Sequence, residues 1–499
     1  MENTELPLTR PTYTPPRLLS DLLVRNRKTL ERIVTLGREN AAGSGRHHLL
    51  LVGPPGCGKT HILSLALARL ERGAPPSRRP LVARLPEIPW GITTFADLLL
   101  RALEALPRKG KEGLRGAGDP GGTRDVATAA RLLKEAAGKR TLLLVVENLD
   151  QVFGALGEEG RREFRAFLQQ DSFTAVLATS RRLFDEVTRR NSPFYGFFRV
   201  EHMEPLDSRA ALNLAGKILE KFASRAGKGP ASRPETASWI RAVQHVSRGN
   251  ARCCLLFALG LARGDSYGKA FLDTLDRIGP LHVEETLGVS PQQRKILDYL
   301  ARRGGAVQVK EIARACLATE QTVSAQLREL RKPGLVAATR AGRNSFYEVS
   351  DPLLRLYLDL RRGGASRVLE RLAFLSHWYR PGEKDNFRLR EILRPGPGEG
   401  KWERALPALL EDSGKKGALL ELGVGLVRSL GDLFSSPLAE EAGRTWVETW
   451  KAKASSLREL AFPLRLLEGG FQEGLAPRSP AFMALPLEGR EILRPLLPG

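Results

Sequence analysis

The chain has 499 residues, with 78 Lys or Arg against 56 Asp or Glu, and a formal net charge of +22 at pH 7. This length exceeds one ordinary domain, and no apolar run approaches the roughly 18 residues that a membrane span needs. The N-terminal residues do not resemble a secretory signal, and the four cysteines have neither metal-ligand nor disulfide-framework spacing. We therefore expect a cytoplasmic protein with several domains. The charge favours a polyanionic partner such as nucleic acid, although a GC-rich genome that favours Arg, or a generally basic surface, would produce it too.

The first part of the chain alternates helical and strand patterns. Residues 1–15 are polar and Pro-rich, an amphipathic pattern predicts one helix over residues 18–36, and the Gly- and Lys-rich residues 107–124 are typical of a mobile loop. The expected strands cover residues 48–52, 80–85, 141–146 and 173–179, and the expected helices cover residues 62–70, 93–106, 125–137 and 158–170. This alternation predicts an α/β fold with a parallel sheet and right-handed crossovers.

The most informative motif is GPPGCGKT at residues 53–60, which matches the phosphate-binding pattern G-x-x-x-x-G-K-[ST]. It lies between an expected strand and an expected helix, as the pattern requires. Glycines let backbone N–H groups approach phosphates, and a helix N-terminus favours an anion. We expect ATP to bind here, with Lys59 reaching the outer phosphates and the Thr60 hydroxyl ligating Mg²⁺. The candidate ATP-binding residues of this segment are Gly53, Pro54, Pro55, Gly56, Cys57, Gly58, Lys59, Thr60 and His61.

An acidic candidate follows the strand at residues 141–146. Glu147 is at the carboxyl end of this strand, where an acid can hold the Mg²⁺ shell. The next residue, Asn148, occupies the position where many such ATPases carry the carboxylate that orients the attacking water. Because an amide cannot accept a proton as a base, we predict slow ATP hydrolysis. The candidate catalytic residues are Lys59, Glu147, Asn148 and Arg181.

Further polar residues are candidates for contact with the nucleotide. Thr179, Ser180 and Arg181 follow one another at the end of a strand and can sense the γ-phosphate, Arg181 through a bidentate pair. Arg252 opens the helix at residues 252–262, where it either couples a helical lid to the γ-phosphate or is simply a solvated arginine. Arg189 and Arg190 are weaker candidates for contact with a neighbouring subunit's nucleotide.

Residues 16–362 resemble AAA+ ATPases of the origin-recognition type and the related STAND ATPases. The resemblance is carried by VRNR (24–27), GPPGCGKT (53–60), LLLVVENLD (142–150), LATSR (177–181) and GNAR (249–252), in this order. It implies an α/β P-loop core, a helical lid, switching driven by ATP, and contact of Arg27 and its neighbours with the adenine side. ENLD departs from the usual Asp-Glu pair, which puts efficient hydrolysis in question but not binding.

Residues 290–349 predict three helices followed by a hairpin. The expected helices cover 290–300, 309–315 and 320–331, and the expected strands cover 335–338 and 345–349. The pattern resembles the winged helix-turn-helix domains of MarR-type regulators and of AAA+ ATPases. The third helix would then enter the major groove, and the wing would meet phosphate or the minor groove. The candidate contacts with double-stranded DNA are Gln321, Thr322, Ser324, Ala325 and Arg328 on the helix, and Arg340 and Arg343 on the wing.

Two interpretations of this winged helix remain open. Residues 287–362 contain 14 basic and 7 acidic residues, which favours DNA binding. In STAND ATPases, however, such a domain often packs on the lid as a structural piece, and Glu320 and Glu329 dilute the basic face. Residues 363–499 predict an α-helical scaffold for protein contacts, with Trp402, Trp446 and Trp450 between helices and a final capping helix at 485–493.

The sequence thus predicts an arm and helix (1–46), a P-loop ATPase core (47–204), a helical lid (205–280), a winged helix (281–362) and an all-α C-terminal domain (363–499). The expected function is a prokaryotic ATP-dependent switch that couples its nucleotide state to DNA binding in replication, transposition, regulation or defence against foreign DNA. The alternative is a protein-sensing signalling ATPase that forms oligomers with ATP and uses its winged helix structurally.

Overall fold

The computed structural model separates into two compact units, which are described one at a time. The first unit comprises residues 1–206 with Asn250–Arg252, and the second comprises residues 207–249 and 253–499. The described residues are 10–43, 46–73, 75, 79–87, 90–107, 126–170, 173–223, 233–283, 286, 288–341, 343–380, 423–424, 427, 462–463, 466 and 479–496. The expected loop at 107–124, the expected tryptophan packing and most of the helices expected between residues 381 and 478 lie outside them.

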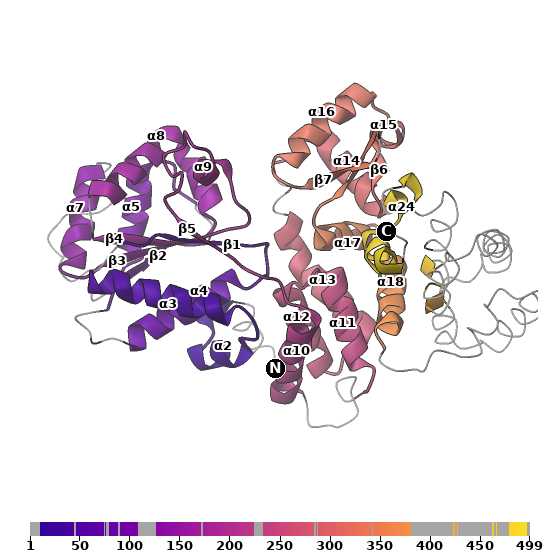
Figure 1. The fold of residues 1–499 in the computed structure, drawn as a ribbon, viewed down its shortest axis with the longest axis horizontal. Coiled ribbons are helices and arrows are strands. Elements are labelled where there is room, and N and C mark those ends of the chain that lie inside the picture. The colour runs from indigo at the N-terminus through magenta and orange to yellow at the C-terminus, as the bar shows by residue number, and fades with distance from the viewer. Residues whose placement is uncertain are drawn as a thin grey trace, which may run out of the picture. The chain divides into compact units, whose positions relative to one another are not determined.

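The first unit is a parallel β-sheet between two layers of helices (Figure 1). Its strands are β1 (Leu49–Val52), β2 (Leu81–Arg84), β3 (Leu142–Val146), β4 (Thr174–Ser180) and β5 (Arg199–His202). Its helices are η1 (Pro11–Tyr13), α2 (Pro16–Leu22), α3 (Arg27–Ala42), α4 (Lys59–Arg72), α5 (Phe95–Glu104), α7 (Val126–Ala137), α8 (Leu149–Gln170) and α9 (Asp185–Thr188). The strand order is β2-β3-β4-β1-β5, with every pair parallel. The carboxyl ends of β3, β4 and β1 therefore meet at one edge of the sheet.

Alternating side chains of the strands form two separate cores. Leu50 and Val52 of β1 pack with α5, α7 and α8 on one face, while Leu49 and Leu51 pack with α2, α3 and α4 on the other. Strands that are buried on both faces read as continuous apolar runs, which is why β1, β3 and β4 could be predicted from the sequence. The expected parallel α/β fold is confirmed.

The structure differs from two of the helix predictions. The helix expected over residues 18–36 is two helices, α2 and α3, because Asn26 takes a left-handed backbone conformation with φ of 62° and interrupts the pattern. The helix expected over residues 158–170 is present as the second part of α8, after the non-helical Gly157, and the first part, from Leu149, was not predicted. Strand β5 was not predicted, since its side chains are mostly exposed and carry no apolar pattern.

His48, directly before β1, is a buried neutral base within the sheet. Its Nδ1 accepts a hydrogen bond from the Val176 N–H at 3.1 Å, and its ring stacks on Phe197 with the centroids 4.2 Å apart. Burial, aided by the positive charges of Arg165 and Arg46, lowers the pKa of His48 from 6.5 to about 4. Protonation would put a hydrogen on the nitrogen that accepts the Val176 hydrogen bond, so protonation of His48 destabilises the folded unit.

We expect this histidine to make the first unit sensitive to acid. In the unfolded chain His48 takes up a proton as the pH falls below 6.5, whereas in the folded chain it does so only near 4, so folding loses stability across this window. Between pH 7 and pH 5 the loss is about 2 kcal/mol. Hydrogen exchange of the β1 and β4 amides at the two pH values measures it. A His48→Gln variant, which keeps an acceptor, removes the loss, and an equal loss in that variant would contradict the assignment.

The second unit contains a group of helices and a winged helix (Figure 1). Its helices are α10 (Ser208–Phe222), α11 (Thr236–Val246), α12 (Ala251–Ala262), α13 (Tyr267–Val283), α14 (Pro291–Arg303), α15 (Val309–Cys316), α16 (Glu320–Arg331), α17 (Pro352–Arg361), α18 (Ala365–Trp378), α24 (Pro480–Ala484), α25 (Leu487–Leu493) and η8 (Arg494–Leu496). The antiparallel strands β6 (Val307–Gln308), β8 (Asn344–Val349) and β7 (Val336–Ala341) form its sheet, in this order. The three expected helices and the hairpin of the winged helix are confirmed.

The C-terminal residues pack against the winged helix. Glu488 of α25 forms a buried ion pair with Arg355 of α17, and Arg490 pairs with Glu348 of β8. The predicted capping helix is thus present as α25, and buried pairs of this kind specify where it docks. Among the described residues, no helix combines the length and the apolar character needed to cross a membrane.

Candidate functional site

The phosphate-binding loop connects β1 to the N-terminus of α4. Gly56 and Gly58 have φ of 75° and 100°, in the left-handed region that glycine alone adopts without strain. A Cβ on Gly56 would approach the Asn250 side chain to 2.4 Å. Backbone strain and steric contact therefore both require glycine at position 56.

Asn250 and Arg252 hold this loop from a distant part of the chain. The Asn250 amide donates to the Pro55 carbonyl at 2.9 Å, and the Arg252 N–H donates to the Gly56 carbonyl at 3.2 Å. Sequence reasoning singled out Arg252 but not Asn250, although both belong to the GNAR segment. The Arg252 backbone thus lies beside the phosphate-binding loop, and Arg252 is in the first turn of α12 (Ala251–Ala262).

Lys59 is the first residue of α4, and its ammonium lies across the loop. It donates to the Gly53 carbonyl at 2.5 Å and to the Pro54 carbonyl at 3.0 Å. Burial lowers the pKa of Lys59; Arg181 lowers it further, while Cys57, Asp150 and Glu147 act in the opposite direction. An anion bound beside this half-buried ammonium would stabilise its charged form.

Glu147, which directly follows β3, contacts the other predicted magnesium ligand, Thr60. The Thr60 hydroxyl donates to one of its carboxylate oxygens at 2.6 Å. Arg84, at the end of β2, donates to the other oxygen from two nitrogens, at 2.6 and 3.2 Å, and also to the Ser64 hydroxyl at 3.1 Å. Glu147 is only 5% exposed. The oxygen donors Thr60 and Glu147 suit a magnesium ion that keeps most of its water.

Arg84 was not predicted from the sequence, because no motif marks the end of an edge strand. Outer-shell partners that orient a metal-binding carboxylate typically change metal affinity or activity by about 10- to 100-fold when removed. We therefore expect Arg84→Ala to raise the Mg²⁺ concentration needed for half-maximal ATP hydrolysis by about 10-fold. The control is Arg131→Ala, which breaks an exposed pair with Glu135 on α7. ATP hydrolysis is measured at increasing Mg²⁺ concentrations for both variants. The same Mg²⁺ dependence in Arg84→Ala and Arg131→Ala would contradict the role of Arg84.

Asn148 follows Glu147 in a left-handed backbone conformation, with φ of 54°. Its side-chain amide donates to the Glu87 carbonyl at 3.1 Å, and its backbone N–H donates to the Thr179 hydroxyl at 3.1 Å. Asparagine tolerates this backbone conformation better than most residues. Thr179, predicted as a γ-phosphate sensor, thus supports the turn after β3.

The end of β4 brings further charge to the same sheet edge. Ser180 is fully buried, and its hydroxyl donates to the Arg182 carbonyl at 2.5 Å. Arg181 lies close enough to Asp150 and Lys59 to lower the pKa of both groups, after the larger effect of burial, which raises that of Asp150 and lowers that of Lys59. The structure therefore places the charge of Arg181 near the phosphate-binding loop, and its contact with a γ-phosphate stays a prediction.

Residues 24–27, which the sequence predicts to contact the adenine side, belong to the first unit. Arg27 is exposed at the start of α3. Its neighbours are anchored, since Arg25 pairs with Glu204 at 2.6 Å and the Asn26 side chain donates to the Glu204 carbonyl at 3.1 Å. A ring nitrogen of His61, on α4, bonds the Leu19 carbonyl of α2 at 2.8 Å. This segment is thereby fixed beside the helix that follows the phosphate-binding loop.

In the second unit, the predicted DNA contacts are all exposed. They are Gln321, Thr322, Ser324, Ala325 and Arg328 on α16, and Arg340 and Arg343 on the β7–β8 hairpin. On the opposite face of α16, Val323, Leu327 and Leu330 are buried in the core of the winged helix. In the turn before α16, Leu317 is 89% exposed with φ of 52°. The polar face of the predicted recognition helix is therefore accessible within its own unit.

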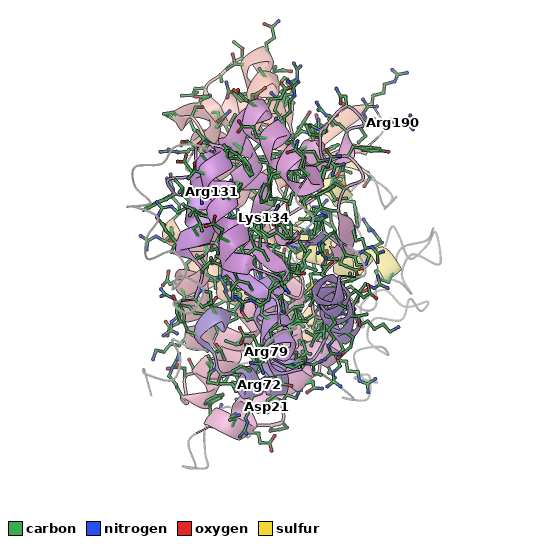
Figure 2. The ribbon with its side chains drawn as sticks, turned by 90° about the vertical axis from the view of Figure 1, so that its left-hand side faces the viewer. Asp21, Arg72, Arg79, Arg131, Lys134 and Arg190 are labelled. Carbon is green, nitrogen blue, oxygen red and sulfur yellow. The ribbon has the colours of Figure 1, made fainter. Side chains whose placement is uncertain are left out.

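Basic side chains are also exposed on the first unit. Arg131 and Lys134 lie on α7, and Arg72 lies at the end of α4 (Figure 2). Arg189 is ion-paired with Asp185 at 2.5 Å, whereas Arg190 lies exposed (Figure 2). The positive charge of the chain is thus spread over both units, so net charge alone does not locate a nucleic-acid surface.

Comparison with known proteins identifies two domains. Residues 41–187 match the AAA domain family, and residues 287–344 match the MarR family. A search of curated proteins gives no match.

Similar solved structures include the Walker-type ATPase PABY2304 of Pyrococcus abyssi, at 18% identity and a TM-score of 0.48, covering 67% of this chain and 95% of that one. The ORC1 protein of Aeropyrum pernix in complex with DNA has 16% identity and a TM-score of 0.43, covering 70% and 98%. Drosophila ORC bound to DNA has 13% identity and a TM-score of 0.33, covering 64% and 92%.

Proposed function

Because the chain joins an AAA domain to a MarR-type winged helix, we propose that it is an ATP-dependent switch that binds Mg-ATP, hydrolyses it slowly, and couples its nucleotide state to binding of double-stranded DNA. The observation that carries the ATPase part is the contact between the Thr60 hydroxyl and the Glu147 carboxylate, made beside the half-buried Lys59 on a glycine loop. The DNA part is supported by the exposed polar face of α16 and the arginines of the wing. The same proposal includes that the protein is prokaryotic and acts inside the cell.

Each of the site residues in the first unit has a physical role in this proposal. The loop N–H groups and the N-terminus of α4 bind the phosphates, and Lys59 adds a positive charge to the outer two. Thr60 and Glu147 would hold Mg²⁺, which when bound neutralises charge on the phosphates. Arg84 fixes the orientation of Glu147, and Arg181 is placed to stabilise negative charge that develops on the γ-phosphate.

The same arrangement suggests how nucleotide binding reaches the rest of the chain. Asn250 and Arg252 bond carbonyls of the phosphate-binding loop, and their segment continues into α12. A loop that changes shape around phosphates would move this attachment. The free energy of Mg-ATP binding could then favour one arrangement of the lid over another, which is the requirement for a switch.

A protein-sensing ATPase that forms oligomers with ATP is the second candidate. The docking of α25 on the winged helix through the buried Arg355–Glu488 pair favours it, since the winged helix then also serves as an anchor for C-terminal residues. The experiment is equilibrium binding of a fluorescent DNA duplex, in Mg-ATP and in Mg-ADP, with size measured by light scattering. Different DNA affinities in the two nucleotides support the switch, whereas oligomers that form with ATP and ignore DNA support the alternative.

A further inference from the structure

The residue that usually orients the attacking water is replaced in this chain by Asn148, and the structure gives that residue another task. Its amide donates to the Glu87 carbonyl, and its φ of 54° is a conformation that costs most L-residues about 1–2 kcal/mol. A glutamate placed here would be strained and would lose the bond to Glu87. A carboxylate that orients the attacking water in this site would therefore come from another position.

Asp150 is a second carboxylate near the end of β3. It lies in the first turn of α8, where a negative charge is favoured by the helix dipole. Strand β3, which precedes it, pairs with β4, and β4 pairs with β1, so Asp150 shares the sheet edge with Arg181 and the phosphate-binding loop. The electrostatic effect of Asp150 on Lys59 and of Arg181 on Asp150 places the three charges close together.

One oxygen of this carboxylate lacks a hydrogen bond. Asp150 Oδ1 is buried and has no partner among the described residues. Leaving a buried acceptor unpaired costs about 1–3 kcal/mol, and charged groups cost more. In addition, burial raises the pKa of Asp150, while Arg181 and the Ser180 hydroxyl act to lower it. A carboxylate with an unmet acceptor at the edge of a phosphate site is suited to bind a water molecule.

We propose that Asp150 supplies the carboxylate that orients the attacking water and accepts its proton, in place of the residue at position 148. This proposal rests on the proposed ATPase function. The water oxygen bonds to the γ-phosphorus as the bond from that phosphorus to the β–γ bridging oxygen breaks, and the electron pair leaves with ADP. The proton of the water passes to Asp150 and from there to solvent, so ATP and water yield ADP, phosphate and one proton.

The test compares Asp150→Asn with Asp185→Asn in the full chain. Asp185 is an exposed aspartate of the same unit, paired with Arg189, so its replacement removes a carboxylate without touching the site. Two quantities are measured: the affinity for a fluorescent ATP analogue, and the single-turnover rate of hydrolysis of bound ATP. We expect Asp150→Asn to slow hydrolysis by about 100-fold, in the range of general base catalysis, with nucleotide affinity within a factor of about 2. Asp185→Asn should match the wild type in both.

Two further variants make the outcome unambiguous. Asp150→Glu keeps a carboxylate and should hydrolyse ATP faster than Asp150→Asn. Asn148→Glu introduced into Asp150→Asn should not restore hydrolysis, and restoration would overturn the proposal. Hydrolysis by Asp150→Asn near the wild-type rate would also overturn the role of Asp150, as would a loss of nucleotide affinity equal to the loss of rate. Neither result would contradict the proposed ATPase function. A wild-type chain that does not bind the ATP analogue would instead overturn the proposed function, and the role of Asp150 with it.

Discussion

Lys59→Ala is expected to weaken ATP binding by about 10- to 100-fold and to lower turnover by about 100- to 1,000-fold. The first figure follows from losing charge-assisted hydrogen bonds worth about 1.5–3 kcal/mol, and the second from losing an electrostatic contact to the reacting phosphate. Because the Lys59 ammonium is half-buried and, among the described residues, bonds loop carbonyls and the Cys57 thiol, its removal should leave the rest of the fold intact.

Thermal unfolding with and without Mg-ATP measures the binding effect. A ligand present at about 100 times its dissociation constant stabilises a protein by about 2.7 kcal/mol, so Mg-ATP should raise the unfolding temperature of the wild type far more than that of Lys59→Ala. The matched control is Lys139→Ala, which removes an exposed lysine of the same unit. An equal rise for Lys59→Ala and the wild type would exclude the phosphate-binding loop as the nucleotide site.

Replacing Arg328, Arg340 and Arg343 together with alanine is expected to lower affinity for duplex DNA by about 100-fold. A side chain that reads a base contributes about 1–3 kcal/mol, which is the expectation for Arg328 on α16. Each wing arginine that neutralises a phosphate contributes about one unit to the slope of log affinity against log salt concentration. The slope should therefore become shallower by about two units.

A charge-matched control separates site-specific contacts from net charge. Arg209, Arg303 and Arg494 are exposed arginines of the same unit outside α16 and the wing, so their joint replacement by alanine removes the same charge. Fluorescence anisotropy over a range of salt concentrations gives both affinity and slope. Equal losses in the two triple variants would mean that the winged helix does not read DNA, and would favour its structural role.

Much of the ATPase core could be predicted because its signals are local. The phosphate-binding motif, the apolar strand before Glu147 and the strand that ends in Arg181 are contiguous in sequence, and parallel topology brings their ends together. The break between α2 and α3 was missed because Asn26 is a polar residue within an amphipathic pattern, and its left-handed conformation depends on bonds to Glu204.

The missed site residues depend on contacts across the chain. Arg84 acts only because β2 pairs with β3, which brings it to Glu147. Asn250 reaches the Pro55 carbonyl from nearly 200 positions along the chain, and a lone asparagine after a glycine carries no local signal for this. Asp150 was visible in the ENLD segment, but its unpaired oxygen and its nearness to Lys59 appear only in three dimensions.

The central claim is that this chain is a slow ATPase whose nucleotide state is coupled to DNA. The most direct test is ATP turnover by the purified full chain in Mg²⁺, with and without duplex DNA, against Lys59→Ala as the blank. The account predicts turnover that depends on Lys59, stays below about one per second and increases when duplex DNA is added. Turnover of tens per second abolished by Lys59→Ala would contradict slow hydrolysis, and turnover that duplex DNA leaves unchanged, with ATP tightly retained, would contradict coupling to DNA and favour a protein-sensing switch.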